Sequence, residues 1–157
     1  MRKAFGEALA KLAESDELIY LVVADIGHGI FDSFRKKFPD RFINVGICEQ
    51  SAIGFAAGLA IAGLKPWVYT ITPFLIERPF EQVKLDIDQQ NVNVNLVGYA
   101  DYPSLGPTHS ELDAHKMMSL FSNIKSFFPV DSSETLKFVK FASEYDGPTF
   151  ISLKSDL

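Results

Sequence analysis

The sequence predicts an α/β fold, a doubly wound and mostly parallel sheet flanked by helices, on three observations. Segments with the pattern of strands alternate along the chain with segments of helical spacing, which is typical of parallel strands joined by crossover helices. The first predicted strand, 18–24, is a continuous apolar run rich in Val and Ile, as in strands that are buried on both faces. A polar turn containing Gly follows it directly, and open α/β sheets bind ligands at such turns.

The first half of the chain is predicted to contain three strands and three helices. Apolar residues at helical spacing predict a helix over 3–14, and Pro39 ends a short helix over 31–38. Short apolar runs predict the second and third strands over 41–46 and 67–71.

The third helix, predicted over 50–63, has no charged residue on any face. A helix that is apolar all round is expected to be buried. Glu49 precedes it directly and is therefore expected in its first turn, where the helix dipole favours a negative charge. A carboxyl group that loses its water there is suited to proton transfer, although simple capping of a core helix is the alternative.

The second half continues the alternation. Residues 75–90 have helical spacing, and Pro79 is expected to delay or kink this helix. Alternating Asn and apolar residues predict a fourth strand over 92–98. The rest is expected to form a loop over 100–110, helices over 111–121 and 132–145, and strands over 124–128 and 149–153. No internal repeat or domain boundary is visible, so residues 1–157 are predicted to be a single domain.

The composition favours a cytoplasmic globular protein. Apolar residues make up 47% and charged residues 22% of the chain, and a net charge of -5 without a basic run argues against nucleic acid as the main partner. Cys48 is the single cysteine, which excludes an intrachain disulfide and fits a reducing compartment. The beginning of the chain does not read as a signal peptide, and the helix over 50–63 is too short to span a bilayer. Aromatic residues reach 13%, which indicates either a large subunit interface or a Phe-rich core.

Several residues able to do chemistry fall in loops that should open at the carboxyl edge of the sheet. They are Asp25, His28, Glu49, Arg78 and His109, with Phe74 and Phe80 beside them. The three histidines are scattered and Cys48 stands alone, so no metal-ligand spacing exists. Nucleophile-elbow, phosphate-loop and dinucleotide fingerprints are also absent. An acid/base carboxylate with aromatics, but without a phosphate or metal site, indicates half of an active site.

Five sequence segments carry a resemblance to a known family. They are 38–50 (FPDRFINVGICEQ), 55–60 (FAAGLA), 63–66 (GLKP), 72–75 (TPFL) and 106–109 (GPTH). In this order and spacing they resemble the pyrimidine-binding domain of the transketolase family, which includes 1-deoxyxylulose-5-phosphate synthase. The likeness covers essentially the whole chain. It implies the fold of a pyrimidine domain of thiamine-diphosphate enzymes and an enzyme that transfers a two-carbon ketol unit between sugars.

The resemblance also implies roles for single residues. The glutamate matching Glu49 hydrogen-bonds the aminopyrimidine of thiamine diphosphate and promotes removal of the proton from the reactive thiazolium carbon. Phe74 is expected to stack on the pyrimidine with Phe80 lining the same pocket, or either ring could belong to the core. His109 matches the histidine that contacts the ketose donor, with a solvated loop histidine as the alternative.

Further candidates for substrate contact match the family less closely. Asp25 lies in the first active-site loop, His28 has no certain counterpart, and Arg78 matches an arginine of the deoxyxylulose-phosphate synthase branch with an offset of one residue. Arg2 and Lys154 lie near positions where transketolases keep basic residues for the sugar phosphate.

Three positions depart from the family pattern. Leu105 replaces an aspartate that meets a sugar hydroxyl, Gly29 replaces a phosphate-binding serine, and 97–98 (VG) replaces a substrate histidine. The cofactor side is therefore expected to be intact and the sugar-phosphate side altered, so that a specialised ketose or deoxysugar is a possible substrate.

The family's diphosphate-binding motif, Gly-Asp-Gly followed by Asn, has no counterpart here beyond 145–147 (YDG). The resemblance therefore implies that the cofactor is shared with a diphosphate-binding transketolase subunit, which also holds Mg²⁺. The chain is expected to be either the pyrimidine-binding subunit of a split enzyme, within a heterotetramer, or a fragment of a longer protein. A homodimer through the Ala/Gly helix over 50–63 is also expected. An acyloin condensation from pyruvate remains open as an alternative function. A degenerate assembly subunit and a flavodoxin-like binding module are minor alternatives.

Overall fold

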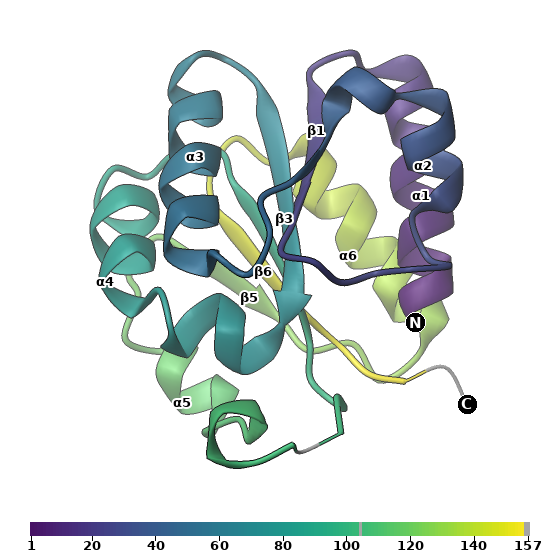
Figure 1. Ribbon diagram of the computed structural model, residues 1–157. Helices are drawn as coiled ribbons and strands as arrows, with labels where there is room; N and C mark the ends of the chain where they lie inside the picture. Colours follow the sequence, from purple (N-terminus) through teal and green to yellow (C-terminus); the bar gives the residue numbers. More distant parts are fainter. Residues whose placement is uncertain (104, 156–157) are drawn as a thin grey trace.

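The computed structural model describes residues 1–103 and 105–155. Within these residues, six parallel strands form one sheet in the order β2-β1-β3-β4-β6-β5 (Figure 1). The strands are β1 (Ile19–Val23), β2 (Phe42–Asn44), β3 (Lys65–Ile71), β4 (Asn95–Tyr99), β5 (Lys125–Phe127) and β6 (Thr149–Leu153). The predicted α/β fold class is thus confirmed, with a sheet that is entirely parallel.

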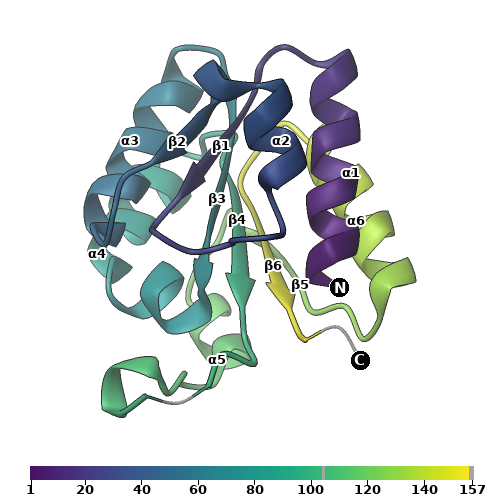
Figure 2. The same ribbon diagram turned by 45° about the vertical axis from the view of Figure 1, so that its right-hand side comes forward.

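Helices cover both faces of the sheet (Figure 2). The α-helices are α1 (Arg2–Ser15), α2 (Asp32–Lys37), α3 (Glu49–Ile61), α4 (Phe80–Gln82), α5 (Ala114–Met118) and α6 (Ser132–Glu144). Two short 3-10 turns, η1 (Pro39–Arg41) and η4 (Pro107–His109), and two π-helical turns, η2 (Pro73–Glu77) and η3 (Val83–Asp88), complete the described elements. α1, α2 and α6 lie on one face, while α3, α4 and α5 lie on the other.

The sheet reverses its strand order between β1 and β3. From β1 the chain moves outward to β2 and then returns to the other side of β1 to form β3. In open α/β sheets, ligands bind outside the carboxyl ends of the strands at such a switch point. The loops after β1, β2 and β3 therefore open toward one region of the sheet edge.

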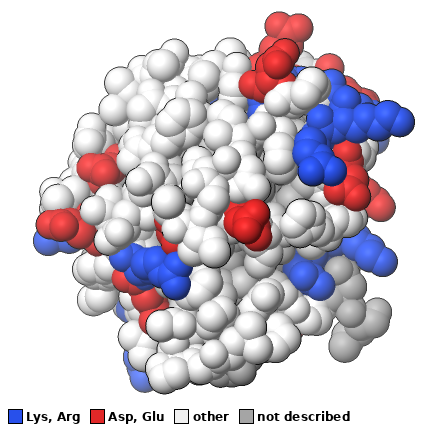
Figure 3. Space-filling model, viewed as in Figure 1, with Lys and Arg blue, Asp and Glu red and all other residues white. Residues whose placement is uncertain are grey.

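Helix α3 begins at Glu49, one residue before the predicted start, and it is not buried all round. Its inner side, including Ile53 and Ala56, is buried against the sheet. Its outer side exposes Gly54 and Gly58 together with 43% of Phe55 and 65% of Ile61. In Figure 3 the surface over α3 is almost free of charged side chains. The prediction that this helix is buried on all sides is wrong within the described residues, because none of the described elements covers its outer half.

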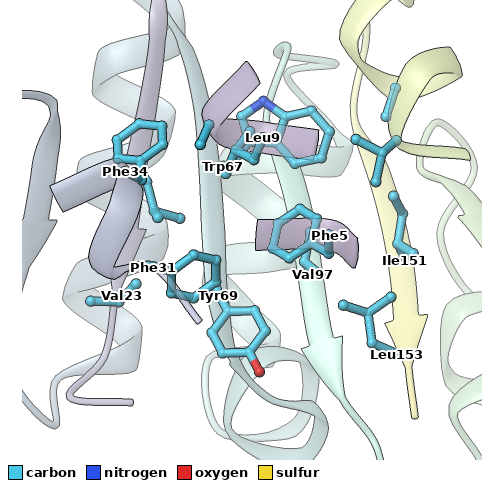
Figure 4. Packing of buried hydrophobic residues seen from close by; sticks show 14 of the residues in the cluster. Phe5, Leu9, Val23, Phe31, Phe34, Trp67, Tyr69, Val97, Ile151 and Leu153 are labelled. Atoms are coloured by element: carbon cyan, nitrogen blue, oxygen red, sulfur yellow. The ribbon is translucent and has the colours of Figure 1, made fainter. Parts of the chain in front are cut away.

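The core on the α1 side of the sheet explains much of the aromatic content (Figure 4). Phe5 packs against Phe31, Trp67 and Tyr69, with ring centroids 5.8 to 6.0 Å apart. Aromatic pairs at such separations add about 0.5–1.5 kcal/mol each beyond the area that they bury. A second core lies between the sheet and α3, η3 and α5. Many of the phenylalanines thus pack within this chain.

Other predicted elements differ in extent. The helix predicted over 75–90 is interrupted at Pro79 and is largely π-helical, and the helix predicted over 111–121 is reduced to α5. The fourth strand begins at Asn95 instead of residue 92. The predicted loop over 100–110 contains η4, and its residue 104, like residues 156–157 of the predicted domain, lies outside the described residues. Among the described residues, no helix is both long and apolar enough to cross a bilayer.

Candidate functional site

Glu49 is the first residue of α3 and one of the most buried acidic residues described, with 3% of its surface exposed. The loop before it is held by Asn44 at the end of β2. The Asn44 side-chain oxygen accepts hydrogen bonds from the backbone N–H groups of Asp25 and Gly46, each at 3.0 Å. The Asn44 amide also donates to the Asp25 carboxylate at 3.2 Å. This side chain therefore ties the loop after β1 to the loop that delivers Glu49.

Arg78 forms an ion pair with Glu49. Its Nη1 donates to Glu49 Oε2 at 2.8 Å, and 33% of the arginine side chain is exposed. The second carboxylate oxygen, Oε1, is buried and has no hydrogen-bond partner within the described structure. A buried carboxylate oxygen without a partner is costly, so this atom is a strong candidate to accept a hydrogen bond from a ligand.

Phe74 and His109 extend the site along the sheet edge. Phe74 lies in η2 directly after β3, and the Arg78 guanidinium carbon lies 3.5 Å from its ring centroid. The His109 ring, in η4, meets the Phe74 ring edge-on with centroids 4.9 Å apart. The structure thus brings together Glu49, Arg78, Phe74 and His109 from three separate loops.

The described contacts of the other predicted residues are with different partners. The ring contact of Phe80 is with Phe121 at 5.5 Å, and Phe80 packs against the core on the α3 side. Asp25 is exposed, with a left-handed φ of 49° supported by its bonds with Asn44. His28 is exposed and lines a small surface pocket with Phe31 and Asn44. A role of these residues in the site stays a prediction.

Three residues near the site were missed from the sequence. The Tyr102 ring stacks on His109 with centroids 5.8 Å apart, and it meets Tyr99 edge-on. The Glu77 carboxylate accepts the Leu112 backbone N–H at 2.7 Å and so fastens the chain after His109 to η2. No motif marks Tyr102 or Glu77, because their contacts depend on the fold of the loops.

Glu111 is the third missed residue. Burial raises its pKa, and the negative charges of Asp101 and Glu77 act in the same direction, while the Thr72 hydroxyl and Lys154 oppose the shift. Glu111 lines a pocket of about 430 Å³ that also includes His115 and Lys154. This pocket extends the polar surface at the carboxyl ends of β4 and β6.

The positions that depart from the family pattern lie in two exposed loops and on β4. Leu105 is 68% exposed, and Gly29 is exposed with a left-handed φ of 76°. Gly98 lies on β4, where a Cβ atom would stand 2.7 Å from Thr72 Oγ1. Close packing between β4 and the end of β3 therefore explains the glycine at this position.

No group of three or more His, Cys, Asp or Glu side chains that could hold a metal ion occurs among the residues described. The basic residue Arg2 stacks on the Tyr99 ring, with its guanidinium carbon 4.0 Å from the centroid.

The group around Glu49 thus offers one buried carboxylate, the guanidinium of Arg78, an aromatic face and an imidazole. An unpartnered buried carboxylate oxygen beside an aromatic face fits a flat heterocycle that donates hydrogen bonds, such as an aminopyrimidine.

Several known proteins have sequences similar to that of this chain. The family model described as "Transketolase, pyrimidine binding domain" matches residues 1–157. The chain is 44% identical over 123 residues to one of the subunits of apulose-4-phosphate transketolase from Actinobacillus succinogenes, a match that covers 76% of this chain and 40% of that protein. It is 35% identical over 157 residues to 1-deoxy-D-xylulose-5-phosphate synthase of Oleidesulfovibrio alaskensis, covering 95% of this chain and 24% of that protein.

A solved structure of a split gene transketolase, in the form of an inactive beta4 tetramer, superposes with a TM-score of 0.88. It is 34% identical in sequence, and the match covers 98% of this chain and 50% of that chain. The chain therefore spans half or less of the length of these relatives. On the family match and the shared fold, the chain belongs to the transketolase pyrimidine-binding domain family.

Proposed function

We propose that this chain is the pyrimidine-binding part of a thiamine-diphosphate-dependent enzyme that transfers a two-carbon ketol unit between sugar phosphates. In this proposal residues 1–157 act as one domain. The observation that carries it is the buried Glu49 carboxylate, which has an unpartnered oxygen and lies on the same sheet edge as Phe74 and His109. When bound, thiamine diphosphate would supply a carbon nucleophile and an electron sink.

The residues of the chain have distinct roles in this proposal. Glu49 accepts a hydrogen bond from the aminopyrimidine ring and holds or releases a proton at that ring nitrogen. Phe74 provides the aromatic face beside it, and His109 donates to or accepts from the hydroxyl and carbonyl oxygens of the ketose donor. Low exposure of Glu49 keeps water from competing for its carboxylate.

The proposal requires a second polypeptide segment. We propose that a diphosphate-binding transketolase subunit holds the diphosphate and Mg²⁺, and that two copies of this chain meet through the uncharged outer side of α3. The exposed Phe55 and Ile61 support such an interface. The exposed free thiol of Cys48 is consistent with a reducing cytoplasm, where we place the complex.

A ketose phosphate is the first donor to test, because the relative with 44% identity carries the name apulose-4-phosphate transketolase. The second candidate function is acyloin condensation from pyruvate. It is favoured by Arg78, which matches an arginine of the deoxyxylulose-phosphate synthase branch and lies directly at Glu49. Ketose cleavage would support the first function, and pyruvate consumption with release of CO₂ would support the second.

The proposal is tested with Glu49→Gln in a complex reconstituted with a diphosphate-binding subunit. Gln keeps the shape of the side chain but cannot take up the proton, so turnover should fall by at least about 100-fold while the fold is retained. Glu81→Gln, at an exposed position on α4, is the matched control and should keep the activity of the wild type. Wild-type turnover of the Glu49→Gln complex would refute the catalytic role.

A further inference from the structure

The Arg78 guanidinium contacts the same two side chains, Glu49 and Phe74, that the proposed function assigns to the aminopyrimidine ring. Its Nη1 donates to Glu49 Oε2 at 2.8 Å, and its Cζ lies 3.5 Å from the centre of the Phe74 ring. A guanidinium is flat, donates hydrogen bonds along its edge and stacks on aromatic faces. An aminopyrimidine is also flat and presents an amine and a ring nitrogen along one edge. The two groups therefore have similar requirements for a carboxylate and an aromatic face.

Phe74 is held between the core and the other residues of the site. It packs against the core on the α1 side of the sheet, and its ring contacts His109 edge-on. Arg78 stacks on one face of the ring and also bonds Glu49 Oε2. A ring that occupies this face of Phe74 would therefore have to displace the guanidinium.

Arg78 is able to move in this way. Its side chain is 33% exposed, whereas Glu49 is 3% exposed, so the arginine can turn outward while the carboxylate stays in place. If Arg78 left without a replacement, neither Glu49 oxygen would keep a hydrogen-bond partner within the described structure. Such a buried charge is strongly unfavourable. The ion pair thus satisfies one oxygen of Glu49, Oε2, until another hydrogen-bond donor arrives.

We propose that Arg78 is a placeholder for the aminopyrimidine, which competes with the pyrimidine ring for Glu49 and Phe74 and is displaced when that ring binds. The inference rests on the proposed function, since it takes the ligand class from there. It makes Arg78 a determinant of cofactor affinity, because the ring must replace the contacts that the arginine already makes. Arg78 would also discriminate against rings without a hydrogen-bond donor, which cannot replace its bond to the carboxylate.

The test uses the chain by itself and a small probe, 4-amino-5-hydroxymethyl-2-methylpyrimidine, with binding measured by calorimetry or by NMR titration. Arg78→Met keeps a long side chain without hydrogen-bond donors, so this variant should bind the probe at least about tenfold more tightly than the wild type, which corresponds to ~1.4 kcal/mol. Arg78→Lys keeps the charge but loses the flat group, so its affinity for the probe should lie between those of the wild type and Arg78→Met. Arg35→Met, at an exposed arginine on α2, is the matched control and should bind like the wild type.

Two further measurements make the result decisive. Methylguanidinium should compete with the probe in Arg78→Met, because it restores the missing group. In the wild type, the NMR signal of the Arg78 guanidinium should shift on addition of the probe, and this measurement does not depend on the folding of a variant. Equal, weaker or absent binding by Arg78→Met, or an unchanged Arg78 signal when the probe binds, would overturn the proposal.

The outcome is independent of the turnover assay. If Arg78→Met gains affinity for the probe and the reconstituted complexes remain inactive on ketoses and on pyruvate, the placeholder stands and the enzymatic proposal fails. If the wild-type complex turns over and Arg78→Met does not gain affinity, Arg78 assists the cofactor instead of competing with it, and the placeholder is refuted while the enzymatic proposal stands.

Discussion

Replacing Gly98 by Ala should destabilise the chain by a specific clash at the site. A Cβ atom on Gly98 would lie 2.7 Å from Thr72 Oγ1, 3.3 Å from Thr72 Cα and 3.4 Å from the Phe150 ring. The first distance is far shorter than a van der Waals contact, and Thr72 is completely buried. Either β4 or the segment that begins η2 must therefore move, and Phe74 would move with it.

The magnitude follows from the packing. Overfilling a tightly packed interior costs about 1–3 kcal/mol. Loss of the flexibility of glycine in the unfolded chain offsets about 0.4–1 kcal/mol of this. We therefore expect a net loss of about 1–2 kcal/mol in the free energy of unfolding. For a chain of this length that lowers the melting temperature by roughly 2–8 °C.

The assay is chemical and thermal unfolding of a double-mutant cycle with Thr72→Ala. Because Thr72→Ala removes Oγ1, Gly98→Ala should cost less than half as much in that background. The control is Gly58→Ala on the exposed side of α3, where an added Cβ would meet nothing within 4 Å. This substitution should stabilise the helix by up to about 1 kcal/mol, because Ala has the higher helix propensity. Equal costs of Gly98→Ala in both backgrounds would refute the clash as the cause.

Two other predictions concern pH and assembly. Because burial raises the pKa of Glu111 in the folded chain, its contribution to stability is greatest below the unfolded pKa and declines as the pH rises through the folded pKa. The melting temperature of Glu111→Gln should therefore rise relative to that of the wild type as the pH increases from about 4 to about 7. A constant difference in melting temperature across that range would contradict the raised pKa of Glu111. Ile61→Glu should lower the molar mass measured by light scattering, because it places a charge on the apolar outer side of α3. Leu136→Glu on α6 is the control: it replaces another exposed aliphatic residue and should leave the molar mass unchanged. If Ile61→Glu has the same molar mass as Leu136→Glu and the wild type, there is no interface at α3.

The fold could be predicted from the sequence because each strand of the sheet carries its own local signal. The apolar runs and the alternation with helices identify all six described strands, as in β6, whose predicted and observed bounds agree.

The site was predictable only in part. Glu49 and Phe74 follow strands that end at the same sheet edge, so that their proximity to His109 follows from topology. The stacking of Tyr102 on His109 was not predictable, because it depends on the conformation of a loop without regular pattern.

The burial of α3 was misjudged for a physical reason. Sequence alone reports that a helix has no charged side, but it does not report which molecule covers that side. Within the described chain, β1 and β3 cover only the inner half, which contains Ile53 and Ala56. An apolar helix in one polypeptide can therefore be evidence for a second one.

The π-helical turn η2 affects how positions in this segment are matched to those of other proteins. The Arg78 backbone N–H bonds the Pro73 carbonyl at 3.0 Å, five residues earlier, whereas an α-helix would join residues four apart. The turn therefore holds one more residue than an α-helical turn, and every side chain after it is rotated by about 100° relative to an uninterrupted α-helix. In a protein whose corresponding turn is α-helical, the side chain at the matching sequence position would point in a different direction, so equivalences in this segment are better drawn by superposing coordinates.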